Sequence, residues 1–436
     1  MGHLEEALQA HQSGRLAEAL PLYERALAER PDDPDVLHFF GLLRHNLGQS
    51  APAIELIKQS LALAPANPHA WINLGNILTE LGRHGHAKRA YQEGCTCGPD
   101  LAEAWYGLGM CLRNIEDPQN AIGPLTRSLE LRPGNSRCLH ERAMAHRDAR
   151  EFEAAELDYR AAVEADPANN RAREGLGRIL YRMGRIDEAA QAYRAWQERE
   201  PDNVVARYMA GAMSGDRELS RAPEDYVAES FNRFADTYED NLTSLGYRAH
   251  ELAIAALRTA AGEGRLGHVL DAGCGTGFCG PLLRPLTRRL TGVDLSASMI
   301  DRARTKGCYD AIEEAEICSF MCAHADAFDA VVSADTLNYF GALEDPIAGA
   351  ATCLRPGGWL VFTLENMQVD ASSGYRVEPH GRYSHRAGYV ERTLASAGFE
   401  SVALEVKSLR RERGVDVEGL IVSARRRAAA AHGGTP

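Results

Sequence analysis

The sequence contains no long hydrophobic run, since no stretch reaches the roughly 18 apolar residues that a membrane-spanning helix needs. The first ten residues, MGHLEEALQA, have neither the basic segment nor the apolar core of a signal peptide. Clustered basic residues are scarce, because 48 Lys and Arg face 61 Asp and Glu, which gives a formal net charge of −13. We therefore expect a soluble, cytoplasmic protein that contacts neither membrane nor nucleic acid.

Cysteine spacing indicates neither a disulfide framework nor a complete metal site. The ten cysteines lie at irregular intervals, several of them inside apolar runs, which is typical of reduced thiols in a core. Two clusters, Cys95-x-Cys97 and the group of Cys318, Cys322 and His324, each lack the second ligand pair of a tetrahedral zinc site. We expect no bound metal.

The chain is long enough for two or three domains, with 436 residues of which 45% are hydrophobic and 25% charged. The one dense basic cluster, Arg425 to Arg427, lies in a tail rich in Ala and Gly. We expect this tail, residues 425–436, to be disordered.

The N-terminal half repeats with a period of 34 residues. Six prolines follow this spacing, at Pro31, Pro65, Pro99, Pro133, Pro167 and Pro201. Small residues such as Gly75 and Ala87 recur in phase with large ones such as Tyr91, a pattern that lets the two helices of a hairpin approach closely. The period is that of the tetratricopeptide repeat. We predict six repeats and a cap helix over residues 1–215, with the fifth repeat, which has Arg142 at a usually apolar position, as the weakest match.

This half resembles tetratricopeptide-repeat proteins, which implies an all-α solenoid whose groove binds a peptide or partner protein. The groove-facing positions, followed at 34-residue steps, are His38, Ile72, Tyr106, His140 and Glu174 in one row and Leu42, Asn76, Met110, Met144 and Arg178 in another. They mix aromatic, apolar and polar side chains, which suits an extended peptide or a helix. The alternative is a packing or dimerising scaffold without a separate ligand.

The C-terminal half alternates strands and helices, which predicts a parallel α/β sheet. A strand at His268–Leu270 runs into a glycine-rich turn, Asp271-Ala-Gly273-Cys-Gly275-Thr-Gly277, and then a helix. Such a turn at the first strand-to-helix junction is a nucleotide cradle.

The identity of the nucleotide depends on Asp271. The segment from Gly275 to Gly280 matches the dinucleotide fingerprint, with Asp294 about twenty residues further on. However, a carboxylate at Asp271 would repel a pyrophosphate, whereas S-adenosylmethionine has no phosphate and carries a positive α-amino group and a sulfonium. Electrostatics therefore favours S-adenosylmethionine over NAD.

The remaining segments follow in the order of a methyl-donor fold. We expect Asp294, after the second strand, to accept both ribose hydroxyls, and Leu295 to Met299 to present an apolar face to adenine. The expected third, fourth and fifth strands are Ala315–Ile317, Phe328–Ser333 and Trp359–Leu364, and the expected last hairpin joins Ser401–Ser408 to Val415–Ser423.

Residues 225–424 resemble class I S-adenosylmethionine-dependent methyltransferases, and the whole chain resembles the bacterial methyltransferases fused to tetratricopeptide repeats. The resemblance rests on four motifs beside the glycine loop, namely Phe231-x2-Phe234-Ala-x2-Tyr238, Val-Asp294-Leu-Ser, Ala-Asp335-x-Leu-x-Tyr339 and Gly-Arg382-Tyr383-x-His385. It implies a Rossmann-like domain over residues 216–424, with a seven-stranded sheet ending in an antiparallel hairpin. The implied or expected cofactor contacts are Tyr238, Asp271, Gly273, Gly275, Gly277, Asp294, Leu295, Met299, Glu316 and Ile317. The family often has Gly-Asp where this chain has Ala315-Glu316.

Methyl transfer requires a positioned nucleophile, and a base if the acceptor begins protonated. The candidates beyond the fourth and fifth strands are His385, Tyr339 and Asp335. His385 is the best single candidate for the base because its unperturbed pKa lies near working pH, although it could equally serve structure. The long segment 366–389 is expected to form a substrate lid.

These observations predict an S-adenosylmethionine-dependent methyltransferase whose repeats recruit a protein or peptide acceptor. A small biosynthetic metabolite is the alternative acceptor, with the repeats holding a partner or a second copy. A non-catalytic adaptor is the third possibility. The acceptor atom (O, N, S or C) and the oligomeric state stay open.

Overall fold

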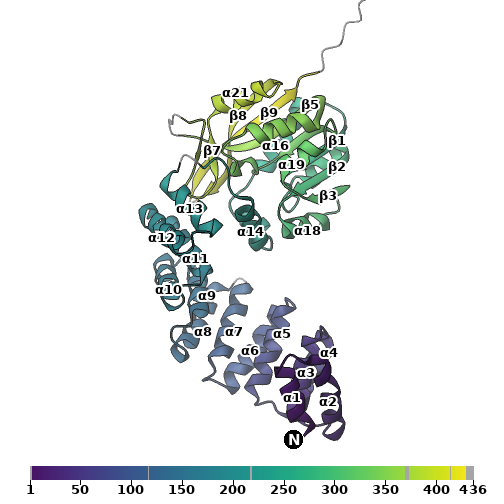
Figure 1. Ribbon diagram of the computed structural model, residues 1–436, viewed down its shortest axis with the longest axis vertical. Coiled ribbons are helices and arrows are strands. Elements are labelled where there is room, and N and C mark those ends of the chain that lie inside the picture. The colour runs from purple at the N-terminus through teal and green to yellow at the C-terminus, as the bar shows by residue number, and fades with distance from the viewer. Residues whose placement is uncertain (1, 116, 217–218, 369–372, 413, 429–436) are drawn as a thin grey trace, which may run out of the picture. The chain divides into compact units, whose positions relative to one another are not determined.

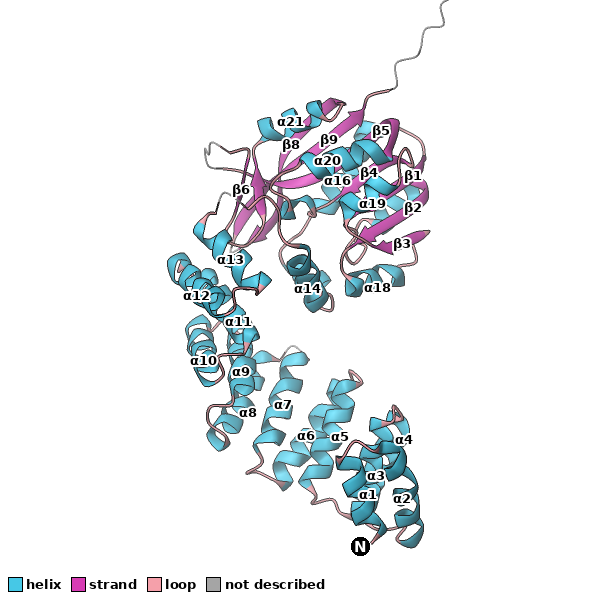
Figure 2. Ribbon diagram, in the orientation of Figure 1, coloured by secondary structure: helices cyan, strands magenta, loops and turns pink. Residues whose placement is uncertain are grey.

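The structure is a computed structural model that describes residues 2–115, 117–216, 219–368, 373–412 and 414–428. The chain divides into two compact units, Met1–Ala192 and Tyr193–Pro436. The first unit is helical, and the second combines helices with one mixed sheet (Figures 1 and 2). None of the helices in the described ranges is both long and apolar enough to cross a membrane.

The first unit is a series of helical hairpins. Its helices are α1 (His3–Gln12), α2 (Leu16–Glu29), α3 (Pro34–Asn46), α4 (Ser50–Leu63), α5 (Pro68–Glu80), α6 (His84–Cys97), α7 (Ala102–Asn114), α8 (Pro118–Leu131), α9 (Ser136–Asp148), α10 (Phe152–Ala165) and α11 (Asn170–Arg182), and α12 (Ile186–Arg199) begins within it. Each odd-numbered helix from α1 to α9 packs on the helix that follows it, and consecutive hairpins contact one another. The predicted tetratricopeptide solenoid is confirmed.

Glycines at fixed positions allow the helices of a hairpin to touch. A Cβ at Gly75 would lie 2.8 Å from the Tyr91 ring, and a Cβ at Gly109 would lie 2.5 Å from Leu125. Real Cβ atoms do not approach so closely, so a larger residue at either position would push the two helices apart. The aromatic or aliphatic side chain of the second helix thus fills the space that the glycine leaves.

The weak fifth repeat has an ion pair at a position where its neighbours carry leucine. Arg142 of α9 donates from Nε and Nη2 to the two carboxylate oxygens of Asp158 of α10, each at 2.7 Å. The Asp158 side chain is 8% exposed, so the pair is largely shielded from water. This bidentate contact explains why the repeat can tolerate arginine where its neighbours carry an apolar residue.

The helix expected to cap the array is α13 (Val204–Ser214), and it lies in the second unit. The compact boundary is therefore at residue 192, whereas the sequence pattern places it at 215. The physical reason is the apolar face of α13: Tyr208 is 1% exposed, stands 4.8 Å from the Tyr226 ring and donates its hydroxyl to the Gly381 carbonyl at 2.8 Å.

The second unit contains a nine-stranded sheet. Its strands are β1 (Leu266–Ala272), β2 (Thr287–Asp294), β3 (Ala311–Glu314), β4 (Phe328–Ser333), β5 (Leu354–Asn366), β6 (Tyr375–Val377), β7 (Tyr383–His385), β8 (Phe399–Glu412) and β9 (Val415–Arg426). The order is β3-β2-β1-β4-β5-β7-β6, and β9 pairs antiparallel with both β5 and β8. In β4, the central residues Ala330–Val332 are an apolar run because the strand is buried on both faces of the sheet. The Rossmann-like sheet with an antiparallel last hairpin is confirmed, with nine strands instead of the expected seven because β6 and β7 extend it.

The helices of this unit after α13 are α14 (Glu224–Phe234), α15 (Tyr238–Ser244), α16 (Ala249–Ala261), α17 (Gly280–Leu283), α18 (Ala297–Thr305), α19 (Ile317–Ala323), α20 (Glu344–Cys353) and α21 (Ala387–Ser396). Of these helices, α16 packs against β4, β5 and β9, and α18 packs against β2 and β3.

Three local expectations differ from the structure. The third strand is residues 311–314, and Glu316 instead caps α19 by accepting from the amides of Cys318 and Ser319. The expected lid contains β6 and β7, and β7 extends the sheet by pairing with the end of β5; its residues 369–372 lie outside the described part of the chain. Arg425 and Arg426 of the expected disordered tail belong to β9, where Arg425 pairs with Trp359, and residues 429–436 lie outside the described part.

Candidate active site

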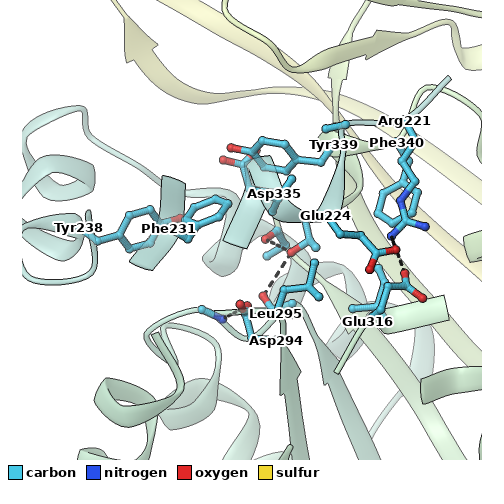
Figure 3. Close-up of a pocket in the computed structure, with 17 residues that line it drawn as sticks. Arg221, Glu224, Phe231, Tyr238, Asp294, Leu295, Glu316, Asp335, Tyr339 and Phe340 are labelled. Carbon is cyan, nitrogen blue, oxygen red and sulfur yellow. Dashed lines mark hydrogen bonds and ion pairs between the residues drawn. The ribbon is translucent and has the colours of Figure 1, made fainter. Parts of the chain in front are cut away.

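A pocket opens at the carboxyl ends of β1, β2 and β4, the position at which α/β sheets bind ligands. The space around it is about 660 Å³, part of which is open solvent. Nine of the predicted site residues line it: Tyr238, Gly273, Gly275, Asp294, Leu295, Glu316, Ile317, Asp335 and Tyr339. The other four predicted residues, Asp271, Gly277, Met299 and His385, are not among its lining residues. In Figure 3, Tyr238 and Phe231 lie at one end, and Arg221, Phe340 and Glu316 at the other.

The glycine-rich turn forms one wall because its backbone is left-handed. Gly273, Gly275 and Gly277 have φ values of 77°, 53° and 86°, a region that other residues rarely adopt. A Cβ at Gly275 would meet no atom within 4 Å, so this backbone faces open space. A Cβ at Gly277 would lie 3.3 Å from the backbone of Ala303 in α18, so that glycine permits close packing of the turn against the next helix.

Asp294 joins the end of β2 to this turn. One carboxylate oxygen accepts from the Gly275 amide at 2.8 Å and the other from the Ser296 amide at 2.9 Å. Burial raises the pKa of Asp294, while these amides and that of Leu295 oppose the rise. The carboxylate is therefore fixed in orientation, with lone pairs left to accept further hydrogen bonds from a ligand.

The charge of the pocket suits a cationic ligand. Its described lining residues include four carboxylates, Glu224, Asp294, Glu316 and Asp335, and one guanidinium, Arg221. Arg221 is already paired, with Glu316 at 2.8 Å and Glu224 at 3.2 Å. A pyrophosphate would meet a lining with more carboxylates than cations.

Asp271 lies behind the pocket. It is fully buried, and its Oδ2 accepts from the Tyr309 hydroxyl at 2.7 Å. Burial raises the pKa of Asp271 to about 7, the Tyr309 hydrogen bond lowers it, and the Asp294 charge raises it. Within the described part of the chain, its Oδ1 has no hydrogen-bond partner. A buried carboxyl of this kind favours its neutral form until a cation or a further donor reaches it.

The raised pKa of Asp271 predicts that the stability of the protein depends on pH. Below about pH 4 Asp271 is protonated in both the folded and the unfolded chain, and between about pH 4 and 7 only the folded chain keeps the proton. The contribution of this proton to the free energy of unfolding is therefore complete at low pH and is lost as pH rises through 7. The free energy of unfolding falls by at most about 1.4 kcal/mol per pH unit on this account. In thermal melts from pH 5 to 8, the stability of the natural protein relative to Asp271→Asn should fall as pH rises. A difference independent of pH would contradict the prediction.

Asp335, at the end of β4, is held in an unusual backbone conformation by several contacts. Its φ is 58°, and its amide donates to the Thr363 hydroxyl at 2.8 Å. Its carboxylate accepts from the Asn338 amide and, at 3.2 Å, from Arg410. Residues that several contacts hold in a rarely populated backbone conformation are common at functional sites.

Arg410 belongs to a buried network of charges behind this wall. Its side chain is 2% exposed and also pairs with Glu365 and, at 2.6 Å, with Glu412. Arg382 donates to the same two carboxylates at 2.7 and 2.6 Å. Burial raises the pKa of Glu365, but Arg382 and the neighbouring cations outweigh it and hold that pKa well below its usual range. Asp335 is therefore part of an ion-paired set, which makes it an orienting carboxylate rather than a free base.

The other two catalytic candidates have different environments. Tyr339 lines the pocket, and burial raises its pKa, so its phenol stays protonated and can donate a hydrogen bond. His385 is fully buried, with Nε2 directed at the Gly341 carbonyl at 3.1 Å, and burial lowers its pKa to about 4. Because His385 does not line the pocket, it is not placed to act as the general base. Its position in β7 makes it a core residue.

The predicted donor contacts also separate into two groups. Leu295 and Ile317 present apolar side chains to the pocket, but Met299 is fully buried in the first turn of α18. Glu316 lines the pocket, although its carboxylate is occupied by the α19 amides and by Arg221. The expected contact of Glu316 with adenine would have to compete with these bonds.

Sequence reasoning missed the wall formed by residues 220–222. This segment pairs with residues 339–341: the Ala222 amide donates to the Tyr339 carbonyl at 2.8 Å, and the Gly341 amide donates to Ser220 at 2.8 Å. The Arg221 guanidinium also lies over the Phe340 ring at 4.5 Å. A short extended segment between helices carries no local pattern, so only its tertiary contacts reveal it.

The predicted groove rows of the first unit are only partly accessible. His38 and Ile72 are 2% and 5% exposed, and His38 is bonded to Asn73 at 2.9 Å. Tyr106, His140, Glu174, Leu42, Met110 and Met144 are half-buried, and Asn76 and Arg178 are exposed. The rows therefore open to solvent mainly from the third repeat onward.

The cysteines are all free thiols, and seven of the ten are buried. Over the described ranges, no group of three His, Cys, Asp or Glu side chains is placed to hold a metal ion.

Comparisons with known proteins separate the chain in the same way. Residues 270–362 match the family model described as a methyltransferase domain, and residues 1–37, 40–102 and 140–204 match tetratricopeptide-repeat models. The class defined by fold and site is therefore a methyltransferase domain joined to a repeat solenoid. The chain combines tetratricopeptide repeats with a class I methyltransferase domain.

Individual relatives cover only parts of the chain. A malonyl-[acyl-carrier protein] O-methyltransferase of Enterobacter lignolyticus is 34% identical over 137 residues, 31% of this chain and 52% of that protein. A ubiquinone biosynthesis O-methyltransferase of Coxiella burnetii is 29% identical over 107 residues, 24% of this chain and 46% of that protein. The chain thus spans about half the length of these curated relatives. A solved structure of Pseudomonas aeruginosa pilF covers 47% of this chain and 93% of its own, with 20% identity and a TM-score of 0.41.

Proposed function

We propose that the protein transfers a methyl group from S-adenosylmethionine to a side chain of a protein or peptide that the repeat array recruits. The observation that carries the donor assignment is the pocket at the carboxyl end of the sheet, where Asp294 is fixed between the Gly275 and Ser296 amides. The match to a methyltransferase domain over the same segment supports the reaction class.

The residues present fit this donor. Asp294 supplies oriented acceptors for ribose hydroxyls, Leu295 and Ile317 supply apolar contact for adenine, and the carboxylate-rich lining suits the sulfonium and α-amino group. Asp271, with its unpartnered buried oxygen, stands behind the glycine turn to complement positive charge. When bound, the donor would supply an electrophilic methyl group. The chain's own residues orient an acceptor and exclude water, and Tyr339 can donate a hydrogen bond at the pocket wall.

The donor assignment is tested by titration calorimetry of the full chain with S-adenosylmethionine. We expect saturable binding, together with a rise in melting temperature that grows with donor concentration. Failure to bind, with no thermal protection, would refute the proposal.

The second candidate acceptor is a small biosynthetic metabolite modified at oxygen. The relatives named as O-methyltransferases favour it. Incubation with methyl-labelled donor and size-fractionated lysate separates the two candidates. Label in the protein fraction supports the first, and label confined to small molecules supports the second.

The role of the array should be tested without truncating the chain at residue 215. A chain that begins at residue 216 would lose α13, whose Tyr208 is buried against Gly381 within the methyltransferase unit. The array should therefore be disabled by substitution in the full chain rather than by deletion to residue 215.

A further inference from the structure

The helices that form the predicted groove change charge along the array. The first of them, α1, carries two glutamates and no arginine or lysine. In contrast, α9 carries three arginines against two acidic residues, and α11 carries four arginines against one glutamate. Although the protein as a whole is acidic, the last groove helices of the array are cationic.

Two of these arginines occupy equivalent positions in successive repeats. Arg137 of α9 and Arg171 of α11 are 34 residues apart, and both are exposed near the start of their helices. Since i and i+3 lie on one face of a helix, Arg137 shares a face with His140 of the predicted groove row, and Arg171 with Glu174. The helices α9 and α11 contact each other directly, so the two faces adjoin (Figure 1).

These arginines differ from their neighbours in having no carboxylate partner. Arg142 is paired with Asp158 at 2.7 Å, and Arg147 with Asp148 at 2.7 Å. Among the residues that the structure describes, the guanidinium groups of Arg137 and Arg171 form no ion pair or hydrogen bond. Two unpaired guanidinium groups on adjacent helices are an available site for carboxylates.

His140 adds an unsatisfied polar atom to this face. It is half-buried beside the Tyr159 ring at 5.7 Å, and, within the described residues, its buried Nδ1 has no hydrogen-bond partner. Burial lowers the pKa of His140; Glu141 opposes this, whereas Arg113 and Arg171 add to it. Arg171 thus lies near enough to act on the imidazole electrostatically.

We propose that the face of α9 and α11 that bears Arg137, His140 and Arg171 binds an acidic segment of the acceptor protein. Charge complementarity carries the choice of partner, because a basic segment would meet repulsion there and an uncharged one would leave both guanidinium groups unpaired. This inference rests on the proposed recruitment function and gives it a recognition chemistry.

The test uses the full chain and a fluorescein-labelled peptide of alternating glutamate and serine, with the glutamine-for-glutamate peptide as control. By fluorescence anisotropy, we expect the acidic peptide to bind and Arg137→Gln with Arg171→Gln to weaken it roughly tenfold at low salt. The matched control is Arg25→Gln with Arg89→Gln, two exposed arginines of α2 and α6, which should leave binding unchanged.

Three results would overturn the inference: equal binding of the glutamine peptide, equal weakening by both double variants, or tighter binding of an RNA oligonucleotide of the same charge. Melting temperatures show whether each variant is folded. Donor binding, measured on the same samples, is expected to be unchanged by the arginine substitutions. Loss of donor binding in the natural protein would refute the methyltransferase proposal without bearing on the peptide site.

Discussion

Asp294→Ala is expected to weaken S-adenosylmethionine binding by roughly a hundredfold or more, because hydrogen bonds to a charged group contribute roughly 1.5–3 kcal/mol each. The substitution removes the acceptors offered to the ribose and also releases the Gly275 and Ser296 amides that hold the glycine turn. Titration calorimetry with the full chain measures the loss. The effect should be large since one carboxylate serves both the turn and the ligand.

Two further variants keep this test interpretable. Asp294→Asn retains one oxygen acceptor and most of the local packing, so it should fold normally and still bind the donor less tightly than the natural protein. Asp240→Ala removes an exposed carboxylate on α15 and should leave the affinity unchanged. If folded Asp294→Ala binds within a factor of about three of the natural protein, which corresponds to less than one hydrogen bond, the proposed contact is wrong.

Arg410→Leu is expected to destabilise the methyltransferase unit by roughly 3–5 kcal/mol, as when one partner of a buried ion pair is removed. The Arg410 side chain is 2% exposed. Its loss removes the ion pair of Asp335 and leaves Glu365 and Glu412 with Arg382 as their close arginine partner among the described residues. For a unit of this size, the melting temperature should fall by roughly 10 °C or more.

The adjacent arginine provides the matched control. Arg411 is 68% exposed and pairs at 3.2 Å with Asp416, itself 59% exposed. An exposed pair contributes at most about 1 kcal/mol, so Arg411→Leu should shift the melting temperature only slightly. Equal shifts for the two variants would show that the buried network contributes no more than a surface pair.

Long-period and chain-local signals allowed much of the fold to be predicted. The 34-residue period specified the hairpins of the first unit, and the strand that runs into Gly273 and Gly275 located the pocket. Both patterns are local consequences of backbone geometry: small residues permit close helices, and glycines permit left-handed turns. The period is visible by comparing positions 34 residues apart, and the glycine turn by its neighbouring residues alone.

The errors concern residues whose roles depend on distant contacts. His385 has the chemistry of a base, but pairing of β7 with β5 places it in the core, and nothing in its neighbourhood in the sequence shows this. Arg410 lies in a charged stretch typical of an exposed turn, yet it meets Asp335 across 75 residues of chain. Tyr309, which bonds Asp271, follows a helix without any motif.

The strand order has a consequence for how the protein is made. β9 lies between β5 and β8, and β8 supplies Arg410, so Asp335 after β4 and Glu365 of β5 obtain this cation only after β8 has been synthesised. A nascent chain that stops before β8 would bury Asp335 and Glu365 without it, which costs free energy. Synthesis and folding are therefore ordered: the repeats can form first, whereas the wall of the pocket is completed only once β8 has been synthesised.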